Sequence, residues 1–256
     1  MRNFFPIFKK ELASYFTSPI AYVVYCMFLI IVGYLFYSGI SFFSILSFQS
    51  LNNPNLAQGL NVTEGVFRPL YLNMGVILLL MMPLLTMRLF AEEKKSGTIE
   101  LLLTNPIRDV EVLLGKYAAC MAVYVIMLLL TALFPVFTTL VGSPEAGPIL
   151  SSYFGLLLLG ASFVAIGTLV SSLTENQIIA AAVTFGILLL LWVISWSASF
   201  AGPVWGTFLL HLSATEHFQN FAKGVLDTQD IIYYLNLSVF CLFLTLRSLE
   251  SKRWRG

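Results

Sequence analysis

Charged side chains that could bind another molecule are concentrated in one segment, residues 88–106. The whole chain is only 11% charged, and long apolar stretches flank this segment on both sides. Carboxylates and cations at this density suit ion pairing with a second protein, although composition alone is equally consistent with a solvated loop. A cap at its start and a proline at its end predict a short helix with an apolar face. The residues that we expect to form this docking segment are Arg88, Glu92, Glu93, Lys94, Gly97, Thr98, Glu100, Leu102, Leu103 and Pro106.

Catalytic motifs are not recognisable in the sequence. His211, Glu216 and His217 lie close together, but their spacing does not place all three on one helical face, so we expect no metal site. The pair Gly115-Lys116 is the nearest approach to a phosphate-binding Walker A motif, and it lacks the preceding glycine and the following Ser or Thr. No metalloprotease or serine-hydrolase motif occurs. We therefore predict that this chain is not an enzyme by itself.

Membrane-spanning helices must position the charged segment. The chain is 58% hydrophobic with a mean hydropathy of +0.86, far above the values of soluble proteins. A bilayer requires about 20 apolar residues per helix, and continuous rather than alternating apolar runs exclude transmembrane strands. We predict an all-α integral membrane protein with a single transmembrane domain, residues 1–256. Its six predicted spans are residues 20–43, 69–90, 116–141, 149–172, 178–200 and 231–248.

Three further segments complete this prediction. Residues 1–18 carry phenylalanines at helical spacing opposite lysines, a pattern typical of an amphipathic helix in the membrane interface. Residues 91–115 form the polar loop that contains most of the charged segment. Residues 201–230 contain an apolar portion too short to cross the bilayer, so we expect a re-entrant or interfacial segment there.

The basic residues indicate the orientation of the chain. With the N-terminus in the cytoplasm, all of the 14 Lys and Arg residues except Arg68 and Lys223 fall on the cytoplasmic side. This bias follows the positive-inside rule and predicts that both termini and the loop 91–115 are cytoplasmic. No span carries an acidic or basic residue near its middle, which argues against a proton pump or an ion-coupled transporter.

Small residues recur at about four-residue spacing in the fourth span. Gly160, Gly167 and Ser171 would allow another helix to approach closely. We favour packing within one chain, and a subunit interface is the alternative. The three cysteines, Cys26, Cys120 and Cys241, lie in different apolar runs and show no metal-binding spacing, so we expect them to be packing residues without a disulfide.

The charged segment resembles the first intracellular loop of ABC-2-type permeases. The matching pattern is Arg88-x-x-x-Glu92-Glu93-Lys94-x-x-Gly97-Thr98-x-Glu100-x-Leu102-Leu103-x-x-Pro106. Other segments are similar to the gliding-motility-associated branch of that family. They are Lys10-Glu11-Leu12-x-x-Tyr15-Phe16-x-Ser18-Pro19, Gly167-x-x-x-Ser171-Ser172-Leu173-Thr174-Glu175-Asn176-Gln177, His217-Phe218-x-x-Phe221-x-x-Gly224-Val225-x-Asp227 and Leu249-Glu250-x-x-Arg253-Trp254.

The resemblance implies a six-helix permease of the type V exporter kind in a bacterial inner membrane. Two permeases, either two copies or this chain with a companion that has an external domain, would stand above a dimer of ABC ATPase subunits. The helix around residues 97–104 would couple to an ATPase groove, where Glu92, Glu93 and Glu100 would pair with basic residues, and Arg88 would anchor the loop. The chain itself would hold no cofactor, because ATP and Mg²⁺ would bind to the partner ATPase. Apart from the lipid bilayer, no other partner is implied, and no nucleic acid.

Three functions remain open at this point. The first is an ATP-driven export permease. The second is a mechanotransmitting subunit of a gliding or secretion machine that moves no solute. The third is a membrane scaffold outside the ABC class. The sequence does not identify a substrate.

Overall fold

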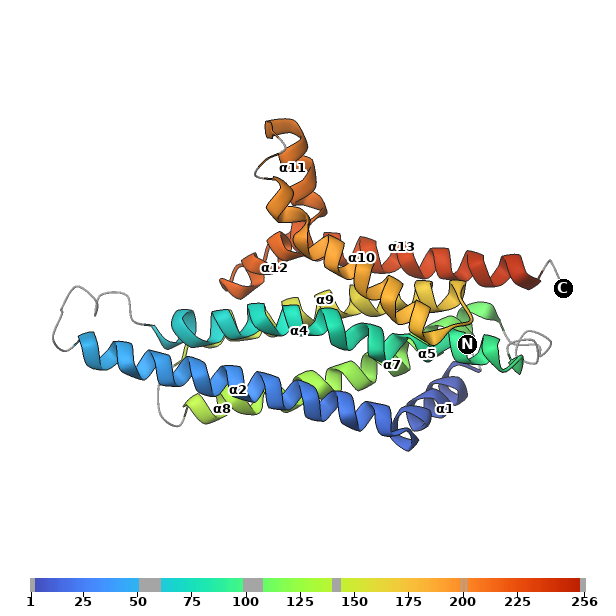
Figure 1. Cartoon of the computed structure of the whole chain (residues 1–256), viewed down its shortest axis with the longest axis horizontal. Helices are drawn as coiled ribbons and strands as arrows, with labels where there is room; N and C mark the ends of the chain where they lie inside the picture. The colour runs from blue at the N-terminus through green and yellow to red at the C-terminus, as the bar shows by residue number, and fades with distance from the viewer. Residues whose placement is uncertain are drawn as a thin grey trace.

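All regular secondary structure is helical in the part of the chain that the structure describes, a computed structural model of residues 3–50, 61–98, 108–139, 144–198, 200 and 202–253 (Figure 1). The first half contains α1 (Phe4–Thr17), α2 (Pro19–Ser50), the short π-helix η1 (Thr63–Phe67), α4 (Arg68–Thr86), α5 (Arg88–Lys95), α7 (Asp109–Thr131) and α8 (Leu133–Thr139). The second half contains α9 (Ala146–Leu173), α10 (Gln177–Ala198), α11 (Gly202–Leu212), α12 (Ala214–Ala222) and α13 (Thr228–Arg253).

Within these described ranges, 6 helical segments are long and apolar enough to cross a membrane. They are Pro19–Ser50, Thr63–Lys95, Asp109–Thr139, Ala146–Leu173, Gln177–Ala198 and Thr228–Ser251. Helices satisfy every backbone hydrogen bond internally, which is what a segment surrounded by hydrocarbon requires. The predicted all-α, six-span fold is therefore confirmed.

Helix α9 forms the centre of the bundle. In its most apolar window 78% of the residues are buried inside the protein, against 22% for the windows of α2, α10 and α13. Close packing depends on its glycines: Gly160 lies against the ring of Tyr124 in α7, and Gly167 lies against Thr86 in α4. A methyl group at either position would overlap the neighbouring side chain. These small residues thus make contacts within one chain.

Several segments meet at one end of the bundle, which we call the α5 end. Figure 1 shows α1, α5 and both ends of the described chain lying there. Helix α1 stops at Thr17 because Ser18 is extended, and Pro19 then starts α2 in a new direction. Helix α1 packs against the beginning of α7, where Ile7 contacts the backbone at Gly115.

The segment after the fifth span folds into two short helices. Helix α11 projects away from the bundle, across the direction of the spanning helices (Figure 1), while α12 packs against α9 and α10. The exposed side chains of α11 are largely apolar, among them Val204, Trp205 and Phe208. The predicted position of residues 201–230 at the external membrane surface stays a prediction.

Candidate functional site: a charged cluster at the α5 end

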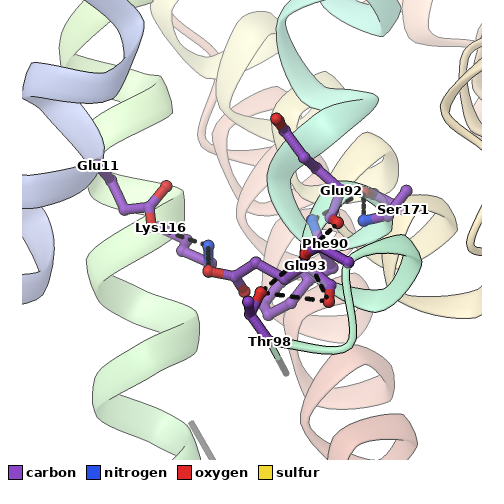
Figure 2. A network of polar contacts seen from close by, with 9 residues as sticks. Glu11, Phe90, Glu92, Glu93, Thr98, Lys116 and Ser171 are labelled. Atoms are coloured by element: carbon purple, nitrogen blue, oxygen red, sulfur yellow. Dashed lines mark hydrogen bonds and ion pairs between the residues drawn. The ribbon is translucent and has the colours of Figure 1, made fainter. Parts of the chain in front are cut away.

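Lys116 is the centre of a cluster that joins three helices. Its side chain, at the start of α7, is only 2% exposed, and its Nζ lies 2.9 Å from Glu11 Oε1 of α1 and 2.9 Å from Glu93 Oε1 of α5. The ammonium group also lies 5.4 Å from the ring centroid of Phe90. Figure 2 shows Lys116 between Glu11 and Glu93. A buried cation requires such partners, because burial without them is strongly unfavourable.

Arg88 makes a second connection between α1 and α5. Its guanidinium donates to the backbone oxygen of Ser14 at 3.2 Å and lies 4.9 Å from the ring centroid of Tyr15. The Tyr15 hydroxyl in turn donates to the backbone oxygen of Leu85 at 2.8 Å. Burial raises the pKa of Tyr15 well above its ordinary value, so this phenol keeps its proton and remains a donor. Together these contacts fix α1 to the junction of α4 and α5.

Ser171 and Lys94 connect α5 to the central helix on its other side. The Ser171 hydroxyl accepts from the backbone N–H groups of Phe90 at 3.0 Å and Ala91 at 3.1 Å, and donates to the backbone oxygen of Met87 at 3.0 Å. These backbone groups lie at the start of α5, where a helix cannot pair them internally. Lys94 is buried and donates to the backbone oxygen of Ser172. Helix α5 is therefore held by α1, α7 and α9 together.

The remaining surface of α5 is open. Glu92 is exposed, and so are the residues from Lys95 to Thr98. Gly97 has a φ of 70°, a conformation that few residues other than glycine adopt easily, and its N–H bonds the backbone oxygen of Lys94. This turn follows the end of α5. The predicted docking residues Glu100, Leu102, Leu103 and Pro106 lie outside the described residues.

An open cleft of about 440 Å³ separates α1 from α5. Its lining is mixed in charge: the basic residues are Lys10, Arg88 and Lys116, and the acidic residues are Glu11, Glu92 and Glu93. One carboxylate oxygen of the lining, Glu93 Oε2, is buried and has no hydrogen-bond partner in the part of the chain that the structure describes. Such a surface suits contact with another polar protein surface.

The structure separates the predicted docking residues into two groups. Glu92, Gly97 and Thr98 lie on the open side, whereas Arg88, Glu93 and Lys94 contact other helices of the same chain. Glu93 is expected to pair with a basic residue of a partner protein, and in this structure it pairs with Lys116 of the same chain.

Other members of the cluster could not be identified from the sequence. Glu11 and Lys116 are separated by 105 positions, and the sequence shows Lys116 as part of an incomplete Walker motif and as one of the basic residues of the cytoplasmic side. Ser171 was singled out for its small size, whereas its hydroxyl makes three hydrogen bonds. The one signal in the sequence is a lysine that stands close to the start of an apolar run.

Comparison with known proteins identifies the family. A family model described as "ABC-2 family transporter protein" matches residues 5–247. A search among curated proteins finds no significant match. Members of this family are membrane permeases coupled to an ATPase, and the chain has no ATPase domain of its own. Since the match extends over nearly the whole chain, the protein belongs to the ABC-2 family of transporters, as a membrane permease.

Proposed function

We propose that α5 and the loop after it receive the motion of a separate ATPase subunit and pass it to the spanning helices. The observation that carries this proposal is the position of α5. One side is open, and the other sides are bonded to α1, α7 and α9. A push on the open side must therefore move several helices together.

Some of the charged residues bind the ATPase, and others transmit its motion to the spanning helices. Glu92 on the open face, with Glu100 in the following loop, pairs with basic residues of the ATPase. Glu93, Lys94 and Arg88 pass the motion on, since each bonds another helix of the permease. Leu102 and Leu103 fill an apolar groove of the ATPase, and Gly97 and Pro106 set the limits of the coupling helix.

The orientation follows from the same assignment. Coupling to an ATPase requires the α5 end to face the cytoplasm, and the positive-inside distribution of Lys and Arg supports this. Because both ends of the described chain lie at the α5 end, both termini are then cytoplasmic (Figure 1). The membrane is the bacterial inner membrane, and ATP and Mg²⁺ bind to the ATPase subunits.

The complete transporter contains two permeases and two ATPase subunits. The sequence similarities of its N-terminal, middle and C-terminal segments support the gliding-motility-associated branch, in which a companion permease carries an external domain. A heteromeric pair of permeases is consistent with that branch, and a homodimer is the alternative.

Charge reversal tests the docking face. We expect Glu92→Lys combined with Glu100→Lys to abolish co-purification of the ATPase subunit encoded with this permease, because like charges then face each other. Glu64→Lys is the matched control, since Glu64 is an exposed acidic residue at the start of the second span, at the end remote from α5. Undiminished assembly of the doubly reversed permease, purified as a folded protein, would refute the proposed docking face.

A further inference from the structure

An apolar groove runs between the third and fourth spans, near the end of the bundle where α8 lies, opposite α5 (Figure 1). Its volume is about 480 Å³. One wall follows α9 from Ala146 through Leu150 to Leu157, and the other follows α7 and α8 from Val125 through Ala132 to Val136. Leu150 is 69% exposed and Val136 is 59% exposed, so the groove opens to the surroundings of the bundle.

A break in the third span produces this groove. Helix α7 ends at Thr131, and α8 begins only after Ala132. The proline at position 135 has no N–H group, so the helical hydrogen bond back to Thr131 cannot form there. Because the third span changes course at this point while α9 continues unbroken, space is left between the two spans.

The polar groups of the lining are satisfied within the chain. The hydroxyl groups that line the groove belong to Tyr153 and Thr139. Thr139 donates to the backbone oxygen of Val136 at 2.7 Å. The Thr131 hydroxyl donates to the backbone oxygen of Leu128, so the Tyr153 hydroxyl, 3.1 Å from Thr131 Oγ1, is the donor of that pair. The groove therefore presents hydrocarbon to an occupant.

Polar side chains mark the outer end of the groove. Glu145, the residue before α9, is exposed and stands between two residues that line the groove. Its Oε1 accepts from Asn61 Nδ2 at 2.7 Å, and its backbone N–H donates to Thr63 Oγ1 at 2.9 Å. The ion pair of Arg68 with Glu64 lies on the turns that follow Thr63. Charges are unfavourable in hydrocarbon, so this end of the groove lies at the membrane surface.

The dimensions of the groove match one chain of a lipid in one leaflet. From Ala146 to Leu157 it extends about 16 Å along α9, at 1.5 Å per residue, which is about half of the ~30 Å hydrocarbon core. A helix occupies roughly 400–600 Å³ per turn. The groove is about three turns long, yet its volume would hold only one turn of a helix. A hydrocarbon chain is thinner than a helix and fits a groove of this shape.

The charge at the mouth favours a headgroup with an ammonium. Of the two basic residues that the charge distribution assigns to this side, Arg68 pairs with Glu64. Lys223 precedes Gly224, which contacts Pro148 on the side of α9 that faces α12. A purely anionic headgroup would therefore meet the carboxylate of Glu145. A primary ammonium can donate a hydrogen bond to that carboxylate, whereas a quaternary ammonium has no N–H.

We propose that this groove binds one acyl chain of a phosphatidylethanolamine in the leaflet remote from α5, with the ammonium of its headgroup at Glu145. With the orientation proposed above, this is the external leaflet. The bound chain fills the space that the break at Ala132 opens, so the lipid becomes part of the packing between the third and fourth spans.

Photo-crosslinking identifies the occupant. Benzoyl-phenylalanine replaces Leu150 in the full-length permease, in nanodiscs with equal amounts of phosphatidylethanolamine, phosphatidylcholine and phosphatidylglycerol of identical acyl chains. The same group in place of Leu190 in α10, which is 71% exposed, is the control. We expect adducts at Leu150 to be enriched in phosphatidylethanolamine by about twofold to fivefold, the range that a surface ion pair supports. Adducts at Leu190 should mirror the lipid mixture. Val136, on the opposite wall, serves as a second position.

Two pairs of variants test the mouth and the groove separately. Glu145→Gln keeps an acceptor for Asn61 but removes the charge, so the enrichment should vanish. Glu175→Gln, an exposed carboxylate between the fourth and fifth spans, should leave it unchanged. Ala132→Phe fills the groove and should also abolish the enrichment, whereas Ala182→Phe on the exposed surface of α10 should not.

The composition of the adducts decides the outcome. Adducts at Leu150 without the ethanolamine enrichment would overturn the proposal. A crosslink from Leu150 to a second permease chain would also overturn it, because the groove would then hold a helix of that copy. Enrichment that survives Glu145→Gln would refute the assignment of the headgroup to Glu145. These measurements use the permease alone, so their outcome is independent of whether α5 binds an ATPase.

Discussion

Lys116 places one cation between two carboxylates, in a position almost without contact with water. Each of the carboxylates keeps only a small exposed fraction, 14% for Glu11 and 15% for Glu93. In such surroundings the attraction between the charges mainly offsets the free energy of removing them from water. The cluster therefore contributes mainly to the arrangement of the helices, because the Lys116 Nζ atom of α7 pairs with both α1 and α5.

Removing the cation alone should lower the free energy of unfolding far more than neutralising all three side chains of the cluster. We expect Lys116→Met to lower the free energy of unfolding by about 3 kcal/mol, because two buried carboxylates then face each other without a cation. Adding Glu11→Gln and Glu93→Gln should restore most of that loss. Thermal unfolding in nanodiscs measures both, with Lys95→Met as the control on the exposed face of α5. A triple variant less stable than Lys116→Met would contradict this account.

Two glycines in the spans, one closely packed and one in open space, allow the effect of an added methyl group to be compared. Gly160 lies against the ring of Tyr124, whereas a methyl group at Gly186 in α10 would meet no atom within 4 Å. We expect Gly160→Ala to reduce stability by about 2 kcal/mol through overpacking, and Gly186→Ala to be neutral or stabilising because alanine favours the helix. The same unfolding measurement compares them. Equal effects at the two positions would show that close packing at Gly160 is unimportant.

At the scale of elements, α5 continues the second span beyond a break at Met87. The break leaves the N–H groups of Phe90 and Ala91 and the oxygen of Met87 in need of partners, and the Ser171 hydroxyl supplies all three. One side chain of α9 thus allows the chain to change direction where α5 begins. The orientation of α5 depends on that hydroxyl more than on any apolar contact of the same residue.

Ser171→Ala should therefore loosen α5 without unfolding the bundle. We expect amide exchange at Phe90 and Ala91 to accelerate by about tenfold or more, since lost bonds to buried groups cost about 1–3 kcal/mol. Hydrogen exchange followed by mass spectrometry over residues 88–95 measures this change. Ser151→Ala is the control, because the buried Ser151 hydroxyl has no hydrogen-bond partner among the described residues. Unchanged exchange in Ser171→Ala would show that α5 is held by other contacts.

The elements were more predictable than the contacts between them. Hydropathy is a local property, so six apolar runs predicted six spanning helices, and the charged segment between two of them was evident as a candidate site. The pairing of Lys116 with Glu11 and Glu93 depends on the rotation of three helices about their axes, which no single stretch of sequence encodes. For the same reason the sequence groups His217 with its neighbours His211 and Glu216, whereas its partner in space is Asp230.

At the scale of the whole molecule, α9 lies between the Lys116 cluster at the α5 end and the contact of His217 in α12 with Asp230 in α13. Near its first turns Gly155 lies against Phe221 of α12, the helix that carries His217, and near its end Ser171 and Ser172 bond α5. Along its length it also contacts α7 at Gly160 and α4 at Gly167. Since a packed helix of this kind moves as a rigid unit, we expect a displacement of α5 to extend through α9 to α12.

Binding of the ATPase and transmission of its motion should therefore be separable by mutation. We expect Lys116→Met combined with Ser171→Ala to leave assembly intact, because Glu92 and the open face of α5 are unchanged, but to reduce sharply the rearrangement of the spans on ATP binding. Spin labels at Tyr37→Cys in α2 and Leu190→Cys in α10, both exposed, report that rearrangement in the assembled complex.

Three results distinguish the possible outcomes of that experiment. The unmodified complex should show a distance that changes between its nucleotide-free and ATP-bound states, and Glu92→Lys with Glu100→Lys should lose the change together with the ATPase. The internal variant should keep the ATPase and its hydrolysis yet show a much smaller distance change, since α5 has then lost its bonds to Lys116 and Ser171 but keeps the Lys94 bond to α9 and the Arg88 bond to α1. A full distance change in the internal variant would mean that the force reaches the spans by a route other than the Lys116 and Ser171 contacts.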